Sequence, residues 1–256
     1  MTDNAELQID MALVQRLIDE QFPDWSALNV APVAVDGWSN RTFHLGDEMS
    51  VRLPSGAEYA GAVAIEQKWL PRLGAKLPLS IPQPIAHGQP SSHYPWPWSI
   101  YKWLPGAVAT KERVVDQNAF AKDLADFLLA LQSIDTEGGP VRELRGGSLS
   151  RYEKQTEAAM RALAGTINID AARDIWDAAL GAPIEEPAVW FHGDVAAGNL
   201  LVVEGRLSSV IDFGGVGVGD PACDLVIAWT FLEPESRAVF RERLGVKDAL
   251  WNRGRG

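Results

Sequence analysis

The chain has 256 residues, 46% of them hydrophobic, and a formal net charge of −11, values typical of a globular protein with a sizeable core in one or two domains. The acidity argues against nucleic acid or an acidic membrane surface as a partner, and it is compatible with a cationic ligand. No apolar run approaches the roughly 20 residues that span a bilayer, the N-terminus has no basic leader, and the single Cys223 excludes an internal disulfide, so we expect a cytoplasmic location.

The N-terminal part of the chain is predicted to form a helix, then strands, then a second helix. Asp10 can cap the first helix, whose apolar residues recur every three or four positions. Strands are expected at residues 29–35, 42–45 and 49–53, and the second helix at about residues 59–73. The turn between the first two strands contains one glycine and the polar Ser39 and Asn40.

A proline-rich connector, residues 77–98, suits extended edges and turns better than sheet interiors, because proline has a fixed φ and no amide N–H. Residues 99–104 are predicted to form an apolar strand that ends in a turn. The chain then becomes mainly helical. Helices are expected from a cap at Asp116 or Asn118, at about residues 150–163, and from a cap at Asp170 to about residue 180, with a glycine-rich break at residues 138–148.

The stretch from Trp190 to Leu225 contains the residues that point to chemistry. It holds Asp194 in His-Gly-Asp, then Asn199, then Asp212 in Asp-Phe-Gly. This order is that of a phosphoryl-transfer site, which needs a base and magnesium ligands. Magnesium prefers oxygen ligands, and one or two protein side chains suffice when phosphates and waters supply the rest.

Residues 199–211 are predicted to form a β-hairpin with its turn at residues 204–205. In the register that this turn sets, Asn199 faces Val210, and Asp212 lies two residues further along on the same face. Diagonal neighbours of this kind are roughly 7–8 Å apart, a gap that two oxygen-bearing side chains and one hydrated cation can fill.

Each of these residues also has an ordinary structural interpretation. Asp194 or Asn199 alone is more often a turn or cap residue, and Asp-Phe-Gly is a common strand exit in which Gly214 supplies a positive φ. The complete set, in this order and hairpin context, would require three independent coincidences. We therefore interpret it as functional.

The segments HGDVAAGN, IDFG and GDPACDL resemble the aminoglycoside phosphotransferase family of small-molecule kinases. The resemblance implies a protein-kinase-like α+β fold, with a small N-terminal lobe built on an antiparallel sheet (residues 1–102) and a larger, mainly helical C-terminal lobe (residues 103–256). It also implies ATP or GTP as the donor, Mg²⁺, and transfer of the terminal phosphoryl group to a hydroxyl of a small molecule.

By this resemblance Asp194 is the catalytic base, Asn199 and Asp212 are the magnesium ligands, and His192 orients the loop. Protein kinases carry an arginine where Gly193 stands here, which fits an enzyme with a small acceptor and no phosphorylated activation loop. The two aspartates of GDPACDL, at positions 220 and 224, resemble the structural carboxylates of the family.

The resemblance also assigns roles in the N-terminal part. The turn with Ser39 and Asn40 would lie over the donor phosphates, although it lacks a Gly-x-Gly-x-x-Gly pattern and an ordinary hairpin turn is the alternative. Arg52 would grip the phosphates in place of the usual lysine, with Glu66 on the next helix as its partner.

Residues 99–106 resemble the hinge between the lobes of the family. There the nucleotide base would bind backbone groups around Lys102, Trp103 and Leu104. The tryptophans of this region are expected to pack the core rather than to stack on the base.

The acceptor is left open by the sequence. An aminosugar antibiotic is one candidate, and choline, homoserine, sugars and macrolides are others, because kinases of all these compounds share the scaffold. Tyr152, Glu153 and Glu157 are candidates for contact with the acceptor, or else lie on a solvated helix face.

The alternative from a different class is a catalytically silent nucleotide-binding module. It is suggested by Arg52, by the glycine-poor turn, and by a chain that ends before the last helices expected in the family. The sequence indicates no oligomeric state.

Overall fold

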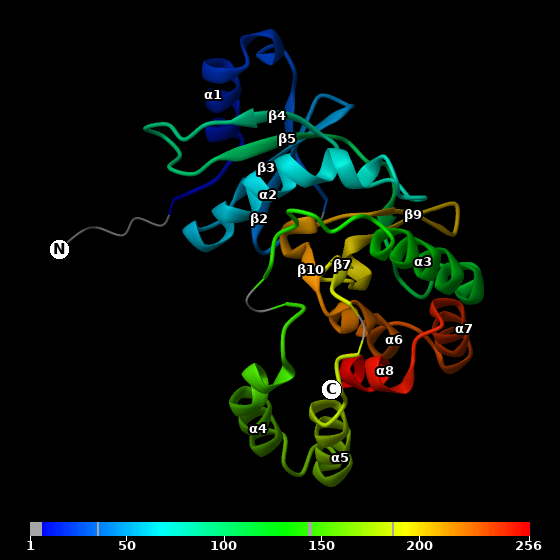
Figure 1. Ribbon diagram of the computed structural model, residues 1–256. Coiled ribbons are helices and arrows are strands. Elements are labelled where there is room, and N and C mark those ends of the chain that lie inside the picture. The colour runs from blue at the N-terminus through cyan, green and yellow to red at the C-terminus, as the bar shows by residue number, and fades with distance from the viewer. Residues whose placement is uncertain (1–6, 35, 143–144, 186) are drawn as a thin grey trace, which may run out of the picture. The chain divides into compact units, whose positions relative to one another are not determined.

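The computed structural model describes residues 7–34, 36–142, 145–185 and 187–256. The chain divides into two compact units, one formed by Met1–Ala75 and Ile81–Leu104, the other by Lys76–Ser80 and Pro105–Gly256 (Figure 1). Within the described residues, no helix is both long and apolar enough to cross a membrane.

In the described residues, the first unit is built on a five-stranded antiparallel sheet with the strand order β1-β2-β3-β5-β4. The strands are β1 (Val30–Pro32), β2 (Asn40–Leu45), β3 (Met49–Pro54), β4 (Pro84–Gly88) and β5 (Trp98–Lys102). The proline-rich connector contributes β4, and this strand lies at an edge of the sheet, where proline is tolerated.

The helices α1 (Met11–Gln21) and α2 (Ala57–Gly74) complete the first unit. Side chains alternate between the faces of a strand, so Val51 and Leu53 join a buried cluster with α1, whereas Arg52 between them reaches Glu66 on α2. Each helix therefore covers a different face of the sheet. The predicted cap of α1 is confirmed, because Asp10 accepts a backbone N–H of the first turn at 2.9 Å.

The second unit combines short antiparallel ribbons with helices. The ribbons have the orders β6-β8-β9 and β10-β7. Their strands are β6 (Ala107–Val108), β7 (Val189–Phe191), β8 (Leu200–Val203), β9 (Arg206–Val210) and β10 (Gly217–Gly219). The helices are α3 (Gln117–Gln132), α4 (Glu153–Ala162), α5 (Ile169–Leu180), α6 (Ile227–Thr230), α7 (Pro234–Leu244) and α8 (Asp248–Arg255), with a 3-10 turn η5 at Pro221–Leu225.

Helix α3 is the buried helix of this unit and packs against α7, with the apolar residues predicted for its core: Phe120, Leu124, Phe127, Leu128 and Leu131. Of the two predicted caps, Asp116 is the one that accepts the first N–H groups of α3. The predicted cap of α5 is wrong. Asn168 accepts the N–H of the first turn at 3.0 Å, and Asp170 lies inside that turn, where its charge favours the positive end of the helix dipole.

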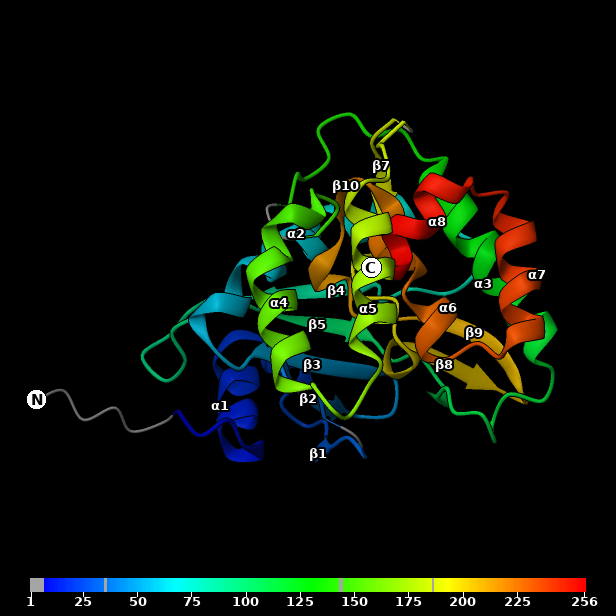
Figure 2. The same ribbon diagram turned by 90° about the horizontal axis from the view of Figure 1, so that it is seen from below.

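Helices α4 and α5 lie side by side in both views (Figures 1 and 2). Glu157 of α4 accepts hydrogen bonds from the guanidinium of Arg173 on α5 at 2.6 and 3.3 Å, and Arg161 lies 3.7 Å from the same carboxylate. The charge of Glu157 is therefore already compensated within the helix pair.

Candidate active site

The predicted hairpin is present, with β8 and β9 joined at Glu204 and Gly205. Both turn residues have a positive φ, of 50° and 81°, as the tight two-residue turn of a hairpin requires. The predicted register is wrong by one residue at the far end. A bulge on β9 makes Leu200 the partner of Val210.

The bulge is formed by Ser208, whose hydroxyl donates to the Leu201 carbonyl oxygen at 3.0 Å. One extra residue on β9 shifts every later pair, so that Asn199 lies opposite Ile211. The backbone carbonyl oxygen of Asn199 accepts the Ile211 N–H at 2.9 Å. Asp212 therefore follows the partner of Asn199 directly. The structure brings these two predicted magnesium ligands to the same end of the ribbon.

Asp212 has a left-handed backbone, with φ of 64°. Aspartate is one of the few non-glycine residues that adopt this conformation, and such strained positions occur at functional sites. In the ordinary structural interpretation of Asp-Phe-Gly, Gly214 would supply the positive φ, but in the structure Asp212 has it and Gly214 does not. The chain turns two residues earlier, at the end of the strand.

Asn199 is tied to Asp194 by two hydrogen bonds. Its Nδ2 donates to the backbone oxygen and to Oδ2 of Asp194, both at 2.9 Å. Since both partners are acceptors, only the amino group of the amide can face them, which leaves the amide Oδ1 for a cation. The other carboxylate oxygen of Asp194, Oδ1, lies 3.6 Å from the guanidinium of Arg145.

His192 is fully buried and joins the loop of Asp194 to the strand that ends at Asp212. Its Nδ1 accepts the N–H of Asp194 at 3.2 Å, and its Nε2 lies 3.0 Å from the carbonyl oxygen of Ile211. The ring also lies edge-on to Phe213, with centroids 4.6 Å apart. Both ring nitrogens therefore have protein partners, and the ring links the loop of Asp194 to the end of the β9 strand.

Asp224 holds the backbone of the loop that leads to Asp194. Its two carboxylate oxygens accept the N–H groups of His192 and Gly193, each at 2.7 Å. Complete burial raises the pKa of Asp224, while the hydrogen bonds donated by the backbone N–H groups of Gly193 and His192 lower it in part. Asp220 is paired with Arg253 of α8 at 2.7 Å, so both aspartates of GDPACDL serve the architecture.

Gly193 has a physical reason to lack a side chain. Its φ is 87°, and a Cβ atom would lie 2.6 Å from the carbonyl oxygen of Gly215. The loop of Asp194 and the turn after Asp212 approach each other at this point. An arginine at position 193 would force them apart.

Sequence patterns gave no sign of Arg142 and Arg145, which lie in the glycine-rich break. Arg142 donates to the carbonyl oxygens of Gly214 and Val216, the latter at 2.8 Å, and so fixes the turn after Asp212. Neither contact is visible from sequence, since 49 residues separate Arg145 from Asp194 and no helix or strand periodicity links them. The sequence shows here only two arginines within a glycine-rich stretch, and that pattern does not indicate which residues they contact.

The predicted pair of Arg52 and Glu66 is formed in the first unit. The Arg52 guanidinium lies 3.5 Å from Oε1 of Glu66, and the hydroxyl of Tyr101 donates to the other carboxylate oxygen. Burial raises the pKa of Tyr101 well above its usual range, and the negative charge of Glu66 adds to that effect. Tyr101 therefore stays a hydrogen-bond donor to Glu66.

The turn before β2 is organised by Asp36, whose Oδ1 accepts the N–H groups of Gly37 and Thr42, both at 2.9 Å. Ser39 accepts the Ser55 N–H through its carbonyl oxygen and a hydrogen bond from the Asn40 amide through its hydroxyl. The side chains of Ser39 and Asn40 are thus bonded to each other.

The predicted hinge is partly occupied by the protein itself. The Lys102 N–H donates to the backbone carbonyl oxygen of Gln83 at 2.9 Å, and the Trp103 N–H donates to that of Glu48 at 2.7 Å. Neither N–H group is therefore available to a nucleotide base. Among the backbone hydrogen bonds of the described residues, none uses the Leu104 N–H. Of the tryptophans expected to pack the core, Trp98 is fully buried there, and Trp96 is partly buried against the same cluster.

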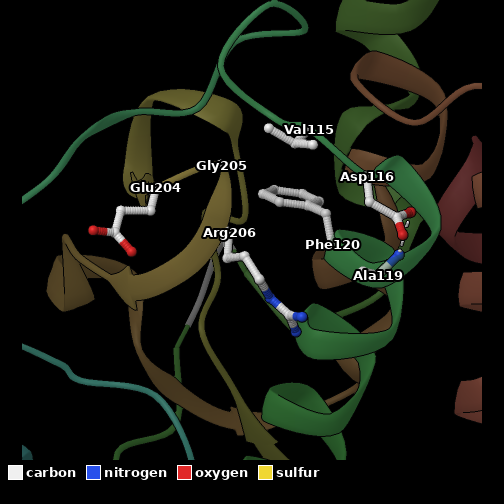
Figure 3. Close-up of a pocket in the computed structure, with 7 residues that line it drawn as sticks. All are labelled: Val115, Asp116, Ala119, Phe120, Glu204, Gly205 and Arg206. Carbon is white, nitrogen blue, oxygen red and sulfur yellow. Dashed lines mark hydrogen bonds between the residues drawn. The ribbon is translucent and has the colours of Figure 1, made fainter.

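A hollow of about 180 Å³ lies at the other end of the β8–β9 ribbon, against the start of α3 (Figure 3). It is lined by Val115, Asp116, Ala119, Phe120, Glu204, Gly205 and Arg206. The Phe120 ring lies between Val115 and Arg206, while the Glu204 carboxylate points away (Figure 3). Since Asn199 and Asp212 lie at the opposite end of the ribbon, this hollow is separate from the site around Asp194.

The site residues fit a hard cation held jointly with a substrate. Among the described residues, no three His, Cys, Asp or Glu side chains are grouped as metal ligands. One carboxylate from Asp212 and one amide oxygen from Asn199 match the partial set that Mg²⁺ takes when phosphates complete its shell.

Comparison with known proteins points to one family. The model of the family described as "Phosphotransferase enzyme family" matches residues 30–256. An aminoglycoside 3'-phosphotransferase from Escherichia coli is 34% identical over 91 residues, which cover 32% of this chain and 33% of that protein. The matched stretch is thus about a third of that relative.

The fold resembles solved structures over almost the whole chain. The GDP and kanamycin complex of APH(2")-IIia superposes with a TM-score of 0.75 at 22% identity, covering 94% of this chain and 86% of that one. A macrolide 2'-phosphotransferase from Brachybacterium faecium, as the apoenzyme, gives a TM-score of 0.66 at 23% identity, covering 94% and 86%. The predicted protein-kinase-like α+β fold is confirmed.

Proposed function

The chain belongs to the phosphotransferase enzyme family, and from this premise we propose that it transfers the terminal phosphoryl group of a nucleoside triphosphate to a hydroxyl of a small molecule. The observation that carries the proposal is the double hydrogen bond from the Asn199 amide to Asp194. It fixes the orientation of both groups, the carboxylate of the proposed base and the amide whose oxygen is the proposed metal ligand.

Asp194 is the proposed base. Its backbone is held by His192 and by Asn199, and its Oδ2 is occupied, so Oδ1 is the oxygen that accepts the proton of the acceptor hydroxyl. Both the rate gain from alignment and that from proton removal depend on this fixed geometry.

Asn199 and Asp212 are the proposed magnesium ligands. Bound there, Mg²⁺ would neutralise charge on the donor phosphates. The protein orients both ligands: the amide through its hydrogen bonds to Asp194, and the carboxylate through the left-handed turn at Asp212.

Arg52 is the proposed phosphate-binding cation of the first unit, oriented by Glu66 and indirectly by Tyr101. A guanidinium can contact phosphate and carboxylate at once, which supports arginine in this place. The turn with Ser39 and Asn40, and the Leu104 N–H, are the proposed contacts for the phosphates and the base. ATP and GTP both remain candidates.

For the acceptor we propose an aminoglycoside or a macrolide, the compounds named for the relatives and neighbours. The net charge of −11 is compatible with a polycation. Glu157, however, is already paired with Arg173, so a cationic amine would have to displace that partner. Tyr152 and Glu153 are the other proposed contacts.

A transfer assay tests the proposal. The purified chain is incubated with Mg²⁺, labelled ATP or GTP, and a panel of kanamycin, a macrolide, choline, homoserine and simple sugars. We expect labelled product with at least one acceptor, its loss in Asp194→Asn, and unchanged activity in Asp170→Asn, an exposed control aspartate in α5. Nucleotide binding without any product would instead support the silent module.

A further inference from the structure

The carboxylate of Asp194 has a cationic neighbour that comes from outside the motif. Arg145 places a guanidinium nitrogen 3.6 Å from Asp194 Oδ1, and about half of each side chain is exposed, 49% and 47%. This is a contact between ions rather than a full hydrogen bond. The guanidinium is thus close to the reacting oxygen and still free to change its position.

Two described residues near Arg145, Pro140 and Gly146, are bonded to the strand β10 and to the residue that follows it. The Asp220 N–H donates to the carbonyl oxygen of Gly146 at 2.9 Å, and the Val218 N–H to that of Pro140 at 2.8 Å. A Cβ on Gly146 would lie 2.2 Å from the Phe191 ring, so Gly146, the residue after Arg145, lies directly against β7. The position of Arg145 is therefore set by the same strands that present Asp194.

The proposed reaction brings a third group to this place. A hydroxyl that donates to Asp194 Oδ1 must also lie about 3–3.5 Å from the phosphorus atom that it attacks. The transferring phosphoryl group is then within roughly 6 Å of the carboxylate. A guanidinium already in contact with that carboxylate can reach a phosphoryl oxygen by rotating its side chain.

We propose that Arg145 is a catalytic residue that binds the phosphoryl group during its transfer, which rests on the function proposed above. The bond from the terminal phosphorus to the bridging oxygen breaks and its electron pair stays on the nucleoside diphosphate. The acceptor oxygen forms the new bond to phosphorus, and its proton goes to Asp194.

The charge changes favour this movement. As Asp194 takes up the proton it loses its negative charge, and with it its attraction for Arg145. At the same moment negative charge is spread over the equatorial oxygens of the phosphoryl group. The guanidinium is thus held by the base before the reaction and by the phosphoryl group in the transition state, so its contact is stronger where catalysis needs it.

Steady-state kinetics of Arg145→Ala test the proposal, using the acceptor found in the panel, or water if none is found. We expect kcat to fall roughly 100-fold, with the KM of the nucleotide changed less than about threefold. Arg145→Lys should retain part of the activity, and added guanidinium should partly rescue Arg145→Ala. Arg151→Ala, at an exposed arginine six residues further on, is the matched control and should behave as wild type. An unchanged kcat in Arg145→Ala would overturn the proposal.

Calorimetry with ADP or GDP and Mg²⁺, with and without aluminium fluoride, gives a second measurement that needs no turnover. Aluminium fluoride imitates the planar phosphoryl group, so it should tighten binding to wild type and do so about 100-fold less in Arg145→Ala, with plain diphosphate binding unchanged. If aluminium fluoride tightens diphosphate binding equally in both proteins, or does not tighten it in wild type, the proposed role of Arg145 is overturned. The proposed function would not be affected by that result. If wild type binds no nucleotide, the proposed function fails as well.

Discussion

Replacing Arg253 with methionine is expected to destabilise the second unit by about 3–5 kcal/mol. The Arg253 and Asp220 side chains are only 3% and 6% exposed, and the guanidinium donates through Nε and Nη2 to the two carboxylate oxygens at 2.7 and 3.3 Å. It also donates to the carbonyl oxygen of Pro183. Methionine fills similar space, so the loss comes mainly from a carboxylate left buried without its cation.

A second substitution separates that penalty from lost packing. Asp220 Oδ1 also accepts the Ala222 N–H at 3.1 Å, a bond that the amide oxygen of asparagine can keep. The double variant Arg253→Met with Asp220→Asn should therefore recover much of the stability, because no charge remains buried.

Thermal and urea unfolding of the wild type, the single and the double variants provide the measurement. For a chain of this size, 1 kcal/mol corresponds to about 2–4 °C, so the single variant should melt roughly 10 °C lower. A loss below about 1 kcal/mol, or a double variant no more stable than Arg253→Met, would refute the reasoning. As a control, Arg243→Met removes an exposed pair with Asp126 and should cost less than about 1 kcal/mol.

Other predictions concern the loop of Asp194 and the turn η5, which contains Cys223 and Asp224. Gly193→Ala should impair transfer and stability, because its Cβ would meet the Gly215 carbonyl, whereas Gly198→Ala, where nothing lies within 4 Å, should be tolerated in both assays. Burial and Asp224 raise the pKa of the Cys223 thiol, so iodoacetamide at pH 8 should label the native protein far more slowly than the unfolded chain. The pKa of Asp224 is raised by burial, so the folded state binds its proton more tightly. The free energy of unfolding should then fall as pH rises from roughly 4 through the raised value, and urea titrations should show this fall to be weaker in Asp224→Asn.

The sequence predicted those parts of the site that depend on local rules. The two-residue turn and the alternating strands predicted the hairpin, and capping rules predicted Asp10 and one of two candidates for α3. The register failed because a bulge at Ser208 needs only one extra residue and has no composition of its own. At α5, Asn168 and Asp170 are both good caps, and the spacing does not distinguish them.

The contacts that complete the site are not local, so no periodicity could reveal them. Arg145 reaches Asp194 because residues near it are bonded to a distant ribbon: the carbonyl oxygens of Pro140 and Gly146 accept N–H groups from β10 and from the residue after it. The same holds for the link from Asp224 to Gly193, which spans 31 residues. The family resemblance located the motif residues, but it could not locate a cation that the motif does not contain.

Two glycines of β10 explain how Arg142 and Gly146 can lie so close to that strand. A Cβ on Gly217 would lie 2.7 Å from the Arg142 side chain, and one on Gly219 would lie 2.5 Å from the Gly146 carbonyl oxygen. Side chains at these two positions of β10 would push Arg142 and Gly146 away from the strand. Arg142 would then lose its hydrogen bond to the turn after Asp212, and Arg145 would move away from Asp194. Because these two glycines carry no side chains, two arginines from a loop can come close to a site built by other elements.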